Sequence, residues 1–141
     1  MITALVMAAG GFSLVLGVWH IWVPRWFGMR TAIGTDGPER PPLRPWVLGR
    51  FVHPTSRADV LGIIGVMNAA TSYVIISIGV AGLLAPVWVC TPDGRWLALW
   101  IAGWWALRVA MQLPIGRRRI DVVVMLLFAV LAAIFVAAAV A

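Results

Sequence analysis

Long apolar runs alternate with shorter polar stretches along this chain, and the runs are long enough to cross a membrane as helices. About 20 predominantly apolar residues are needed to span a hydrocarbon core ~30 Å thick, and three runs have this length: 3–23, 60–85 and 120–141. A fourth run, Trp96–Leu113, is interrupted only by Arg108 and Gln112. The pattern predicts an all-α integral membrane protein with one domain over 1–141, a bundle of four transmembrane helices at about 3–23, 57–85, 95–113 and 120–140.

The first apolar run differs from a secretory signal peptide. A signal peptide begins with a basic region and carries a short apolar core before its cleavage site. Here no Lys or Arg precedes Arg25, and the run is long enough to span the bilayer. We therefore expect the run to remain in the protein as its first helix.

The one long polar segment, 24–56, separates the first two predicted helices. Prolines interrupt it at positions 38, 41, 42, 45 and 54. Because proline lacks a backbone N–H and restricts the residue before it, a continuous helix is excluded. The aromatic residues of the segment favour the headgroup level of the membrane. We expect this loop to lie along the cytoplasmic surface, with residues 46–52 as one or two turns of interfacial helix.

Composition supports the membrane assignment, and charge gives an orientation. Only 11% of the residues are charged, against about 25% in soluble proteins. Most arginines fall in two loops that share one face of the predicted bundle: Arg25, Arg30, Arg40, Arg44, Arg50 and Arg57 in the first, and Arg117, Arg118 and Arg119 in the second. Because basic loops stay in the cytoplasm, both chain termini are predicted to lie outside.

Topology accounts for the net charge of +6, so nucleic-acid binding is not predicted; no basic and aromatic motif of a known nucleic-acid module occurs. All eleven basic residues are Arg, which is typical of a bacterium with a GC-rich genome. The predicted location is therefore the bacterial inner (plasma) membrane.

The single cysteine, Cys90, excludes an internal disulfide and paired-cysteine redox chemistry.

Two predicted helices carry small and polar residues on one face. These are Gly10, Ser13, Gly17 and His20 in the first, and Gly65, Asn68, Ser72 and Gly79 in the second. Spacings of three and four place residues on one side of a helix, and small residues let membrane helices approach closely. We expect these faces to pack against neighbouring helices, with His20 directed into the bundle. Asn68 lies near the bilayer midplane, where its amide needs a hydrogen-bond partner.

The third predicted helix carries a ladder of residues on one side: Trp100, Trp104, Arg108 and Gln112. An arginine at the centre of a membrane helix costs about 2.5–3.5 kcal/mol on insertion scales, although Arg108 lies near enough to the cytoplasmic end to snorkel. Trp104 can offer its ring face to the guanidinium. An inward Arg108 needs an acceptor, for which Asp121, His20, a lipid phosphate and a ligand carboxylate are candidates. A structural Arg108–Asp121 pair and a ligand site therefore remain alternatives.

The polar residues of these faces define a candidate binding pocket. The candidate cofactor-binding residues are His20, Asn68, Trp104, Arg108 and Gln112. A neutral imidazole can ligate haem or a metal, or hydrogen-bond a quinone, so quinone and haem are the candidate cofactors and lipid is an expected ligand. His20 and His53 are weak candidate metal ligands, because no spacing motif joins them. No catalytic residue is predicted.

Three functional hypotheses follow from the sequence. It has no embedded acid pair, metal motif or nucleophile arrangement, and its nine tryptophans suit lipid and interface contacts. The preferred hypothesis is a non-enzymatic accessory or assembly subunit of a bacterial membrane complex, with other membrane subunits and bilayer lipids as partners. The first alternative is a quinone-, haem- or lipid-binding redox subunit with a polar pocket near the cytoplasmic face. The second is a small membrane enzyme that acts on an apolar substrate, with His20 as acid or base.

Overall fold

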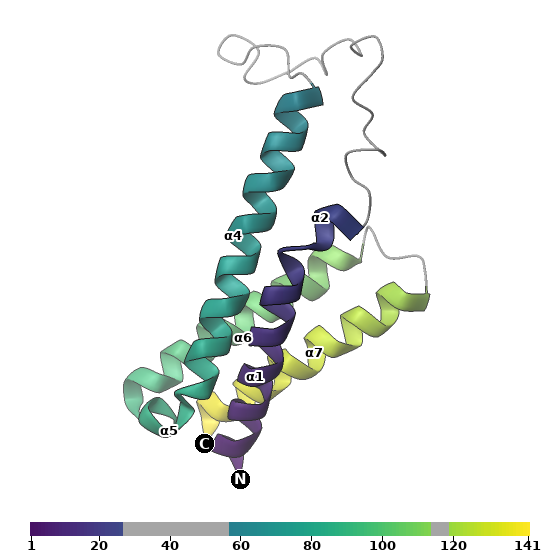
Figure 1. Ribbon diagram of the computed structural model, residues 1–141. Helices are drawn as coiled ribbons and strands as arrows, with labels where there is room; N and C mark the ends of the chain where they lie inside the picture. The colour runs from purple at the N-terminus through teal and green to yellow at the C-terminus, as the bar shows by residue number, and fades with distance from the viewer. Residues whose placement is uncertain (27–56, 114–118) are drawn as a thin grey trace, which may run out of the picture. The chain divides into compact units, whose positions relative to one another are not determined.

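The computed structural model describes residues 1–26, 57–113 and 119–141, which form helices and no strand (Figure 1). The helices are α1 (Ile2–His20), α2 (Val23–Trp26), α4 (Arg57–Leu83), α5 (Ala85–Trp88), α6 (Pro92–Gln112) and α7 (Arg119–Val140). The predicted all-α class is therefore confirmed. Residues 27–56, which hold the predicted 46–52 helix and His53, lie outside the described residues.

Three of these helices are long and apolar enough to cross a membrane. They are Ile2–His20, Leu61–Leu83 within α4, and Asp121–Val140 within α7. The fourth predicted span corresponds to α6, which has 21 residues. It is not among the candidate spans, because Arg95, Arg108 and Gln112 interrupt its apolar residues. The chain thus has the helices of a membrane protein, and the bundle of four spans stays a prediction.

Local capping explains why α6 begins earlier than residue 95, the predicted start. The Thr91 hydroxyl accepts a hydrogen bond from the backbone N–H of Gly94 at 3.0 Å. Pro92 occupies the first turn, where a helix has no use for its missing N–H, and Asp93 suits the positive end of the helix dipole. The segment Thr91–Gly94, whose Thr-Pro-Asp-Gly sequence is typical of a tight turn, is therefore the N-terminal cap and first turn of α6.

A short bend joins α4 to α6. Pro86 lies in the first turn of α5, just after α4 ends at Leu83. The indole Nε1 of Trp88 donates to the carbonyl oxygen of Ala81 at 2.7 Å, which holds α5 back against the end of α4. Cys90 then adopts a φ of 70°, a left-handed conformation that turns the chain towards α6.

The chain divides into two compact units. The first comprises Met1–Val15 and Ile76–Ala141, and the second comprises Leu16–Ile75. Both α1 and α4 contribute residues to each unit. The single domain over 1–141 stays a prediction.

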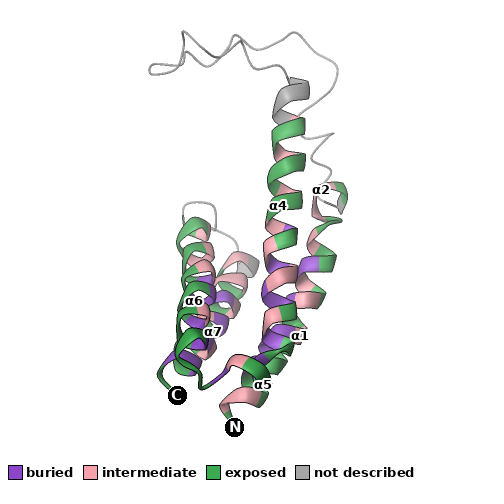
Figure 2. Cartoon of the chain, turned by 90° about the vertical axis from the view of Figure 1, so that its left-hand side faces the viewer, coloured by how far each residue is buried: buried purple, intermediate pink, exposed green. Residues whose placement is uncertain are grey.

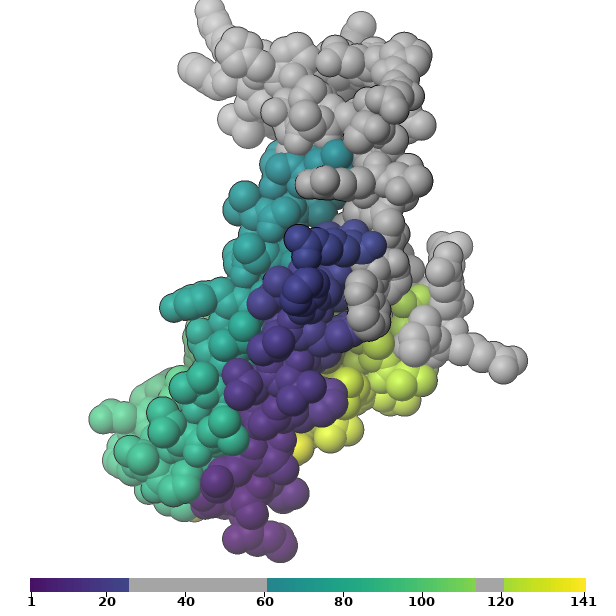
Figure 3. All heavy atoms as spheres, in the orientation of Figure 1, coloured from purple at the N-terminus to yellow at the C-terminus, as the bar shows by residue number. Residues whose placement is uncertain are grey.

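Within the first unit, α1 and α4 pack with their backbones in close contact. A Cβ built on Gly10 would lie 2.6 Å from the Cα of Gly82, and one built on Gly79 would lie 2.7 Å from the Cα of Leu14. Residue numbers rise along α1 as they fall along α4, so the two helices are antiparallel. Atoms of α1 and α4 accordingly lie against each other in Figure 3. The predicted packing of the small-residue face of α1 is confirmed at this contact.

The same unit contains an antiparallel hairpin of α6 and α7. At one end Arg95 Nε donates to the carbonyl oxygen of Ala139 at 2.9 Å. At the other end Gln112 Nε2 donates to Asp121 Oδ1 at 3.3 Å. The interior is apolar, and its fully buried side chains include Ile101, Trp105 and Phe135. Buried residues follow the facing sides of the two helices, and exposed residues follow their outer sides (Figure 2).

Candidate functional site

His20, Asn68 and Ser72 form a polar cluster within the second unit. The His20 Nδ1 and the Ser72 Oγ lie 3.1 Å apart. Ser72 Oγ donates to the carbonyl oxygen of Asn68 at 2.8 Å. Asn68 Nδ2 donates to the carbonyl oxygen of His20 at 3.2 Å. The structure thus brings together two predicted site residues, His20 and Asn68, and adds Ser72 between them.

The position of His20 at the end of α1 explains why Asn68 is needed. The last carbonyl groups of a helix have no partner within the helix, and in an apolar environment such a group is costly. Asn68, one helix away on α4, supplies the missing donor to His20. The expectation that the Asn68 amide has a hydrogen-bond partner is therefore confirmed, and the partner is the backbone of α1.

Ser72 is buried, with 2% of its surface exposed. Its bond to the carbonyl oxygen four residues earlier is the common way for a helical serine to satisfy its hydroxyl. Ser13 makes the same kind of bond to the carbonyl oxygen of Ala9 at 2.7 Å. Ser72 differs because an imidazole also lies within hydrogen-bond distance of its oxygen.

A second group of polar side chains belongs to α6, in the first unit. The Arg108 guanidinium carbon lies 5.6 Å from the centre of the Phe128 ring, and the Trp105 ring lies 5.2 Å from the same ring. Three buried nitrogens here have no hydrogen-bond partner in the described part of the chain: Trp104 Nε1, Trp105 Nε1 and Arg108 Nε. Trp105 and Arg108 thus lie against one aromatic ring, and both carry a buried N–H without a partner among the described residues.

Two expected contacts of Arg108 differ from those in the structure. The ring below its guanidinium is that of Phe128 on α7 and not that of Trp104. Asp121, a candidate acceptor for Arg108, accepts a hydrogen bond from Gln112. Because α7 presents an aromatic ring at the level of Arg108, the guanidinium packs on that ring and the amide of Gln112 takes the carboxylate.

The five predicted site residues fall into the two units. His20 and Asn68 lie in the second unit, and Trp104, Arg108 and Gln112 lie in the first. The prediction that all five line one pocket stays a prediction. Among the described residues no group of three or more His, Cys, Asp or Glu side chains is arranged to hold a metal ion, and His53 lies outside these residues.

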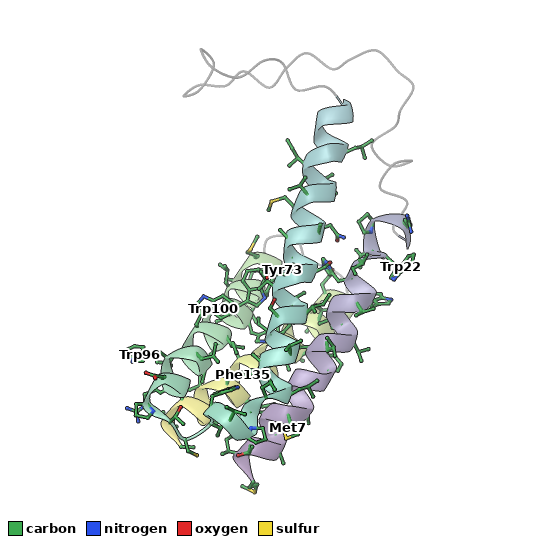
Figure 4. All side chains as sticks on the ribbon, turned by 60° about the vertical axis from the view of Figure 1, so that its left-hand side comes forward. Met7, Trp22, Tyr73, Trp96, Trp100 and Phe135 are labelled. Atoms are coloured by element: carbon green, nitrogen blue, oxygen red, sulfur yellow. The ribbon has the colours of Figure 1, made fainter. Side chains whose placement is uncertain are left out.

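Sequence reasoning missed Trp105 and Phe128 as parts of the α6 site. A signal for Trp105 was present, because the buried residues Ala98, Ile101, Ala102 and Trp105 follow the helical spacing of an inward face. The predicted ladder of every fourth residue contains Trp100 and does not contain Trp105. Trp100 is 57% exposed, and with Trp96 it projects from the outer side of α6 (Figure 4). No pattern in the sequence identifies Phe128 among the other apolar residues of α7.

Part of α4 presents small residues that nothing described covers. A Cβ added to Gly62 or Gly65 would meet no atom within 4 Å, and Gly62, Gly65 and Ala69 are all exposed. Spacings of three and four place these residues within an arc of about 60°. We call them the open face of α4. Gly65 was expected to pack against a neighbouring helix, and among the described residues no atom lies within 4 Å of a Cβ placed there.

Comparison of the chain with protein-family models, with curated proteins and with solved structures finds no match.

Proposed function

We propose that this protein is a non-enzymatic accessory or assembly subunit of a bacterial membrane complex, and that a helix of another subunit packs on the open face of α4. The observation that carries the proposal is the contrast between two sets of glycines. Gly79 and Gly82 on α4 meet the backbone of α1, whereas Gly62 and Gly65 on the same helix meet nothing described.

Exposed glycines on a membrane helix indicate a surface for helix packing. Inside a bilayer, lipid tails are as apolar as leucine, so helices associate through close backbone contact at small residues and not through the hydrophobic effect. The Gly10–Gly82 contact shows that glycines of this chain are used in that way. Exposed apolar side chains such as Val66 and Tyr73 are covered equally well by lipid and carry no such argument.

The proposal includes four membrane crossings. α6 contacts α7 from Arg95 near its start to Gln112 at its end. If α7 crosses the bilayer, α6 crosses beside it over the same depth. Its 21 residues give a length of about 31 Å, which matches the hydrocarbon core. The arginine distribution then supports cytoplasmic basic loops and outer termini in the bacterial inner membrane.

A matched pair of substitutions tests the packing. Ala69→Ile places a branched side chain on the open face, and Ala70→Ile places the same side chain about 100° away on the same helix. Both positions are exposed. After mild detergent extraction from native membranes, mass spectrometry should find a partner subunit with the unchanged chain and with Ala70→Ile, and lose it with Ala69→Ile. Elution of the unchanged chain alone would contradict the proposal, as would equal partner yield from both variants.

The orientation has a test of its own. Cys90 is the only cysteine of the chain and is exposed. If the α4–α6 connection lies outside, a membrane-impermeant maleimide should label Cys90 in spheroplasts before lysis, and Cys90→Ser should abolish the signal. Labelling only after lysis would reverse the orientation.

The unpaired donors of α6 favour a second candidate function, that of a lipid- or quinone-binding subunit. Leaving a buried donor unpaired costs about 1–3 kcal/mol, so Trp104 Nε1 and Arg108 Nε would gain from a ligand that offers only acceptors. A lipid phosphate and a quinone carbonyl both have this chemistry. Trp104→Phe removes one N–H and keeps a ring, while Trp96→Phe makes the same change at an exposed position. Native mass spectrometry should show less bound phospholipid or quinone for Trp104→Phe alone, and equal retention by both variants would exclude this function.

A further inference from the structure

Arg108 brings a positive charge into the α6–α7 hairpin. Its guanidinium carbon lies 5.6 Å from the centre of the Phe128 ring, which has no oxygen atom to accept a hydrogen bond. The Arg108 Nε is buried and has no hydrogen-bond partner in the described part of the chain. A guanidinium carries five N–H donors and keeps its charge in proteins. The contact with Phe128 therefore supplies neither a counter-ion nor an acceptor.

The guanidinium lies inside the apolar part of the hairpin. Side chains of a helix lean towards its N-terminus, which for Arg108 is the direction away from the Gln112–Asp121 contact at the end of α6. Phe128 lies seven residues beyond Asp121, the first residue of the apolar stretch of α7, and seven residues of helix extend about 10 Å. In a bilayer that α7 crosses, the charge is therefore about a third of the way through the ~30 Å of hydrocarbon.

The acidic residues of the chain lie away from this level. There are five, each outside the candidate spans or at the first residue of one: Asp36, Glu39, Asp59, Asp93 and Asp121. Asp93, on the same helix as Arg108, is about 22 Å away along the helix axis. Asp121 is about 10 Å from Phe128 along the axis of α7. The described helices thus offer no carboxylate at the level of Phe128.

We infer that Arg108 binds a carboxylate on a membrane helix of another subunit, an Asp or Glu side chain about 10 Å inside the hydrocarbon. The inference rests on the proposed function and names the chemistry of the partner. Charged residues within membrane helices almost always pair with one another or with backbone carbonyls, and a guanidinium can bind a carboxylate through two parallel N–H bonds. Arg108 and Trp104, one turn apart on one side of α6, are both partly exposed, and Met111 beside them is 50% exposed. A partner helix can therefore reach the guanidinium and pack on apolar side chains around it.

A carboxylate fits these donors better than the two small-molecule acceptors do. A lipid phosphate lies in the headgroup layer, and the bilayer would have to thin by about 10 Å at this side before the phosphate reached the level of Phe128. A quinone carbonyl can enter the hydrocarbon, but it is neutral and gives the charge of Arg108 no counter-ion. A carboxylate supplies a negative charge and acceptor oxygens together. Trp104 Nε1, which also has no partner in the described part of the chain, is a further donor on the same side of α6.

Three variants of the full chain test the inference, each extracted from native membranes in mild detergent with the partner quantified by mass spectrometry. Arg108→Met should lower the partner yield about tenfold or more, because it leaves the carboxylate of the partner unpaired. Arg108→Lys keeps the charge and should keep the partner. Arg95→Met is the matched control, because it removes an arginine of the same helix that bonds to Ala139. Equal yields from Arg108→Met and Arg95→Met would overturn the inference alone, whereas an unchanged chain without any partner would overturn the proposed function with it.

A charge exchange separates a direct ion pair from damage to the hairpin. Arg108→Glu is made in this chain, and an Asp or Glu within a membrane span of the captured partner is changed to Arg. Each change alone should lower the yield about tenfold, and both together should restore most of it, which a misfolded hairpin could not do. A partner without an acidic residue in any span would overturn the inference, as would an exchange that restores nothing. Loss of bound phosphatidylglycerol from Arg108→Met with the partner retained would also overturn it, and would assign the site to a lipid phosphate.

Discussion

The Cα of Gly82 lies 2.6 Å from the point at which a Cβ of Gly10 would stand. Carbon atoms in van der Waals contact are about 3.5–4.0 Å apart, so neither glycine leaves room for any side chain. The contact joins two helices that are each candidate membrane spans. It shows how a chain with little interior of its own obtains close helix packing, and it provides the first prediction.

Gly10→Ala should destabilise the protein by about 1–3 kcal/mol, the usual cost of forcing an extra carbon into a packed contact. Gly11→Ala is the control, because a Cβ there would meet only the Leu83 Cδ2, at an ordinary 3.9 Å. Both changes carry the same intrinsic helix preference, so the difference between them isolates the contact. Unfolding in mixed micelles should separate the two variants. Equal stability would mean that α1 and α4 are further apart than described.

Phe128→Leu should weaken the α6–α7 hairpin more than Phe135→Leu does. Both rings are buried, with 5% and 0% of their surfaces exposed. Phe128 also holds the Trp105 ring and the Arg108 guanidinium. An aromatic pair adds about 0.5–1.5 kcal/mol beyond burial, and a cation–π contact about 0.5–2 kcal/mol.

A double-mutant cycle measures the cation–π contact between Arg108 and Phe128, the second of these two contributions. The cycle combines Phe128→Leu with Arg108→Met and follows the free energy of unfolding. A coupling energy near zero would show that the guanidinium gains nothing from the Phe128 ring. A positive coupling would assign Arg108 a structural partner in addition to any ligand.

Gln112→Glu should weaken the contact between the end of α6 and the start of α7. The Gln112 amide donates to Asp121 at 3.3 Å, and a glutamate there would place two carboxylates together. Gln112→Leu removes the bond without adding charge, and should cost about 0.6 kcal/mol, the average for a hydrogen bond between membrane helices. Hydrogen exchange at the start of α7 should rise in the order unchanged, Leu, Glu. A glutamate variant as protected as the leucine variant would show that Asp121 is not held at this position.

Cys90→Gly should be more stable than Cys90→Ser. Cys90 has a φ of 70°, where an L residue is strained by about 1–2 kcal/mol and glycine is not. Glycine also raises the conformational entropy of the unfolded chain, which reduces the stability gained by about 0.4–1 kcal/mol. The midpoints of these two ranges leave a net gain of about 0.8 kcal/mol for glycine, which should be visible in unfolding curves. A serine variant that equals the glycine variant would mean that the turn relaxes to an extended backbone.

Periodicity predicted which residues of α1 and α4 face a neighbour. Gly10, Ser13 and Gly17 are buried, as are Ser72 and Gly79. The spacing of three and four is a property of one helix, so a sequence reveals it without knowledge of the partner. Gly65 shares that spacing but is open. α1 ends at His20, whose carbonyl oxygen accepts from the Asn68 side-chain amide, and where a neighbouring helix ends cannot be read from the spacing of glycines in α4.

The same distinction applies to the candidate site. That Arg108 needs a partner follows from its charge, and that Asn68 needs one follows from its polar amide within an apolar helix; the predicted midplane depth of Asn68 differs from the structure, where it bonds to the last residue of α1. Which partner each has depends on the register between two helices. Phe128 and Ser72 lie opposite Arg108 and His20 only because of how α7 and α4 are aligned. A shift of one residue would have presented a different side chain.

α4 is longer than the hydrocarbon core of a typical bilayer is thick. Its 27 residues extend about 40 Å, against ~30 Å of hydrocarbon. The apolar stretch Leu61–Leu83 has 23 residues and extends about 35 Å, and residues 57–60 add about 6 Å of helix before it. In a bilayer that Leu61–Leu83 spans, the extra turn would let the membrane thicken locally by about 6 Å before non-helical backbone enters the hydrocarbon layer.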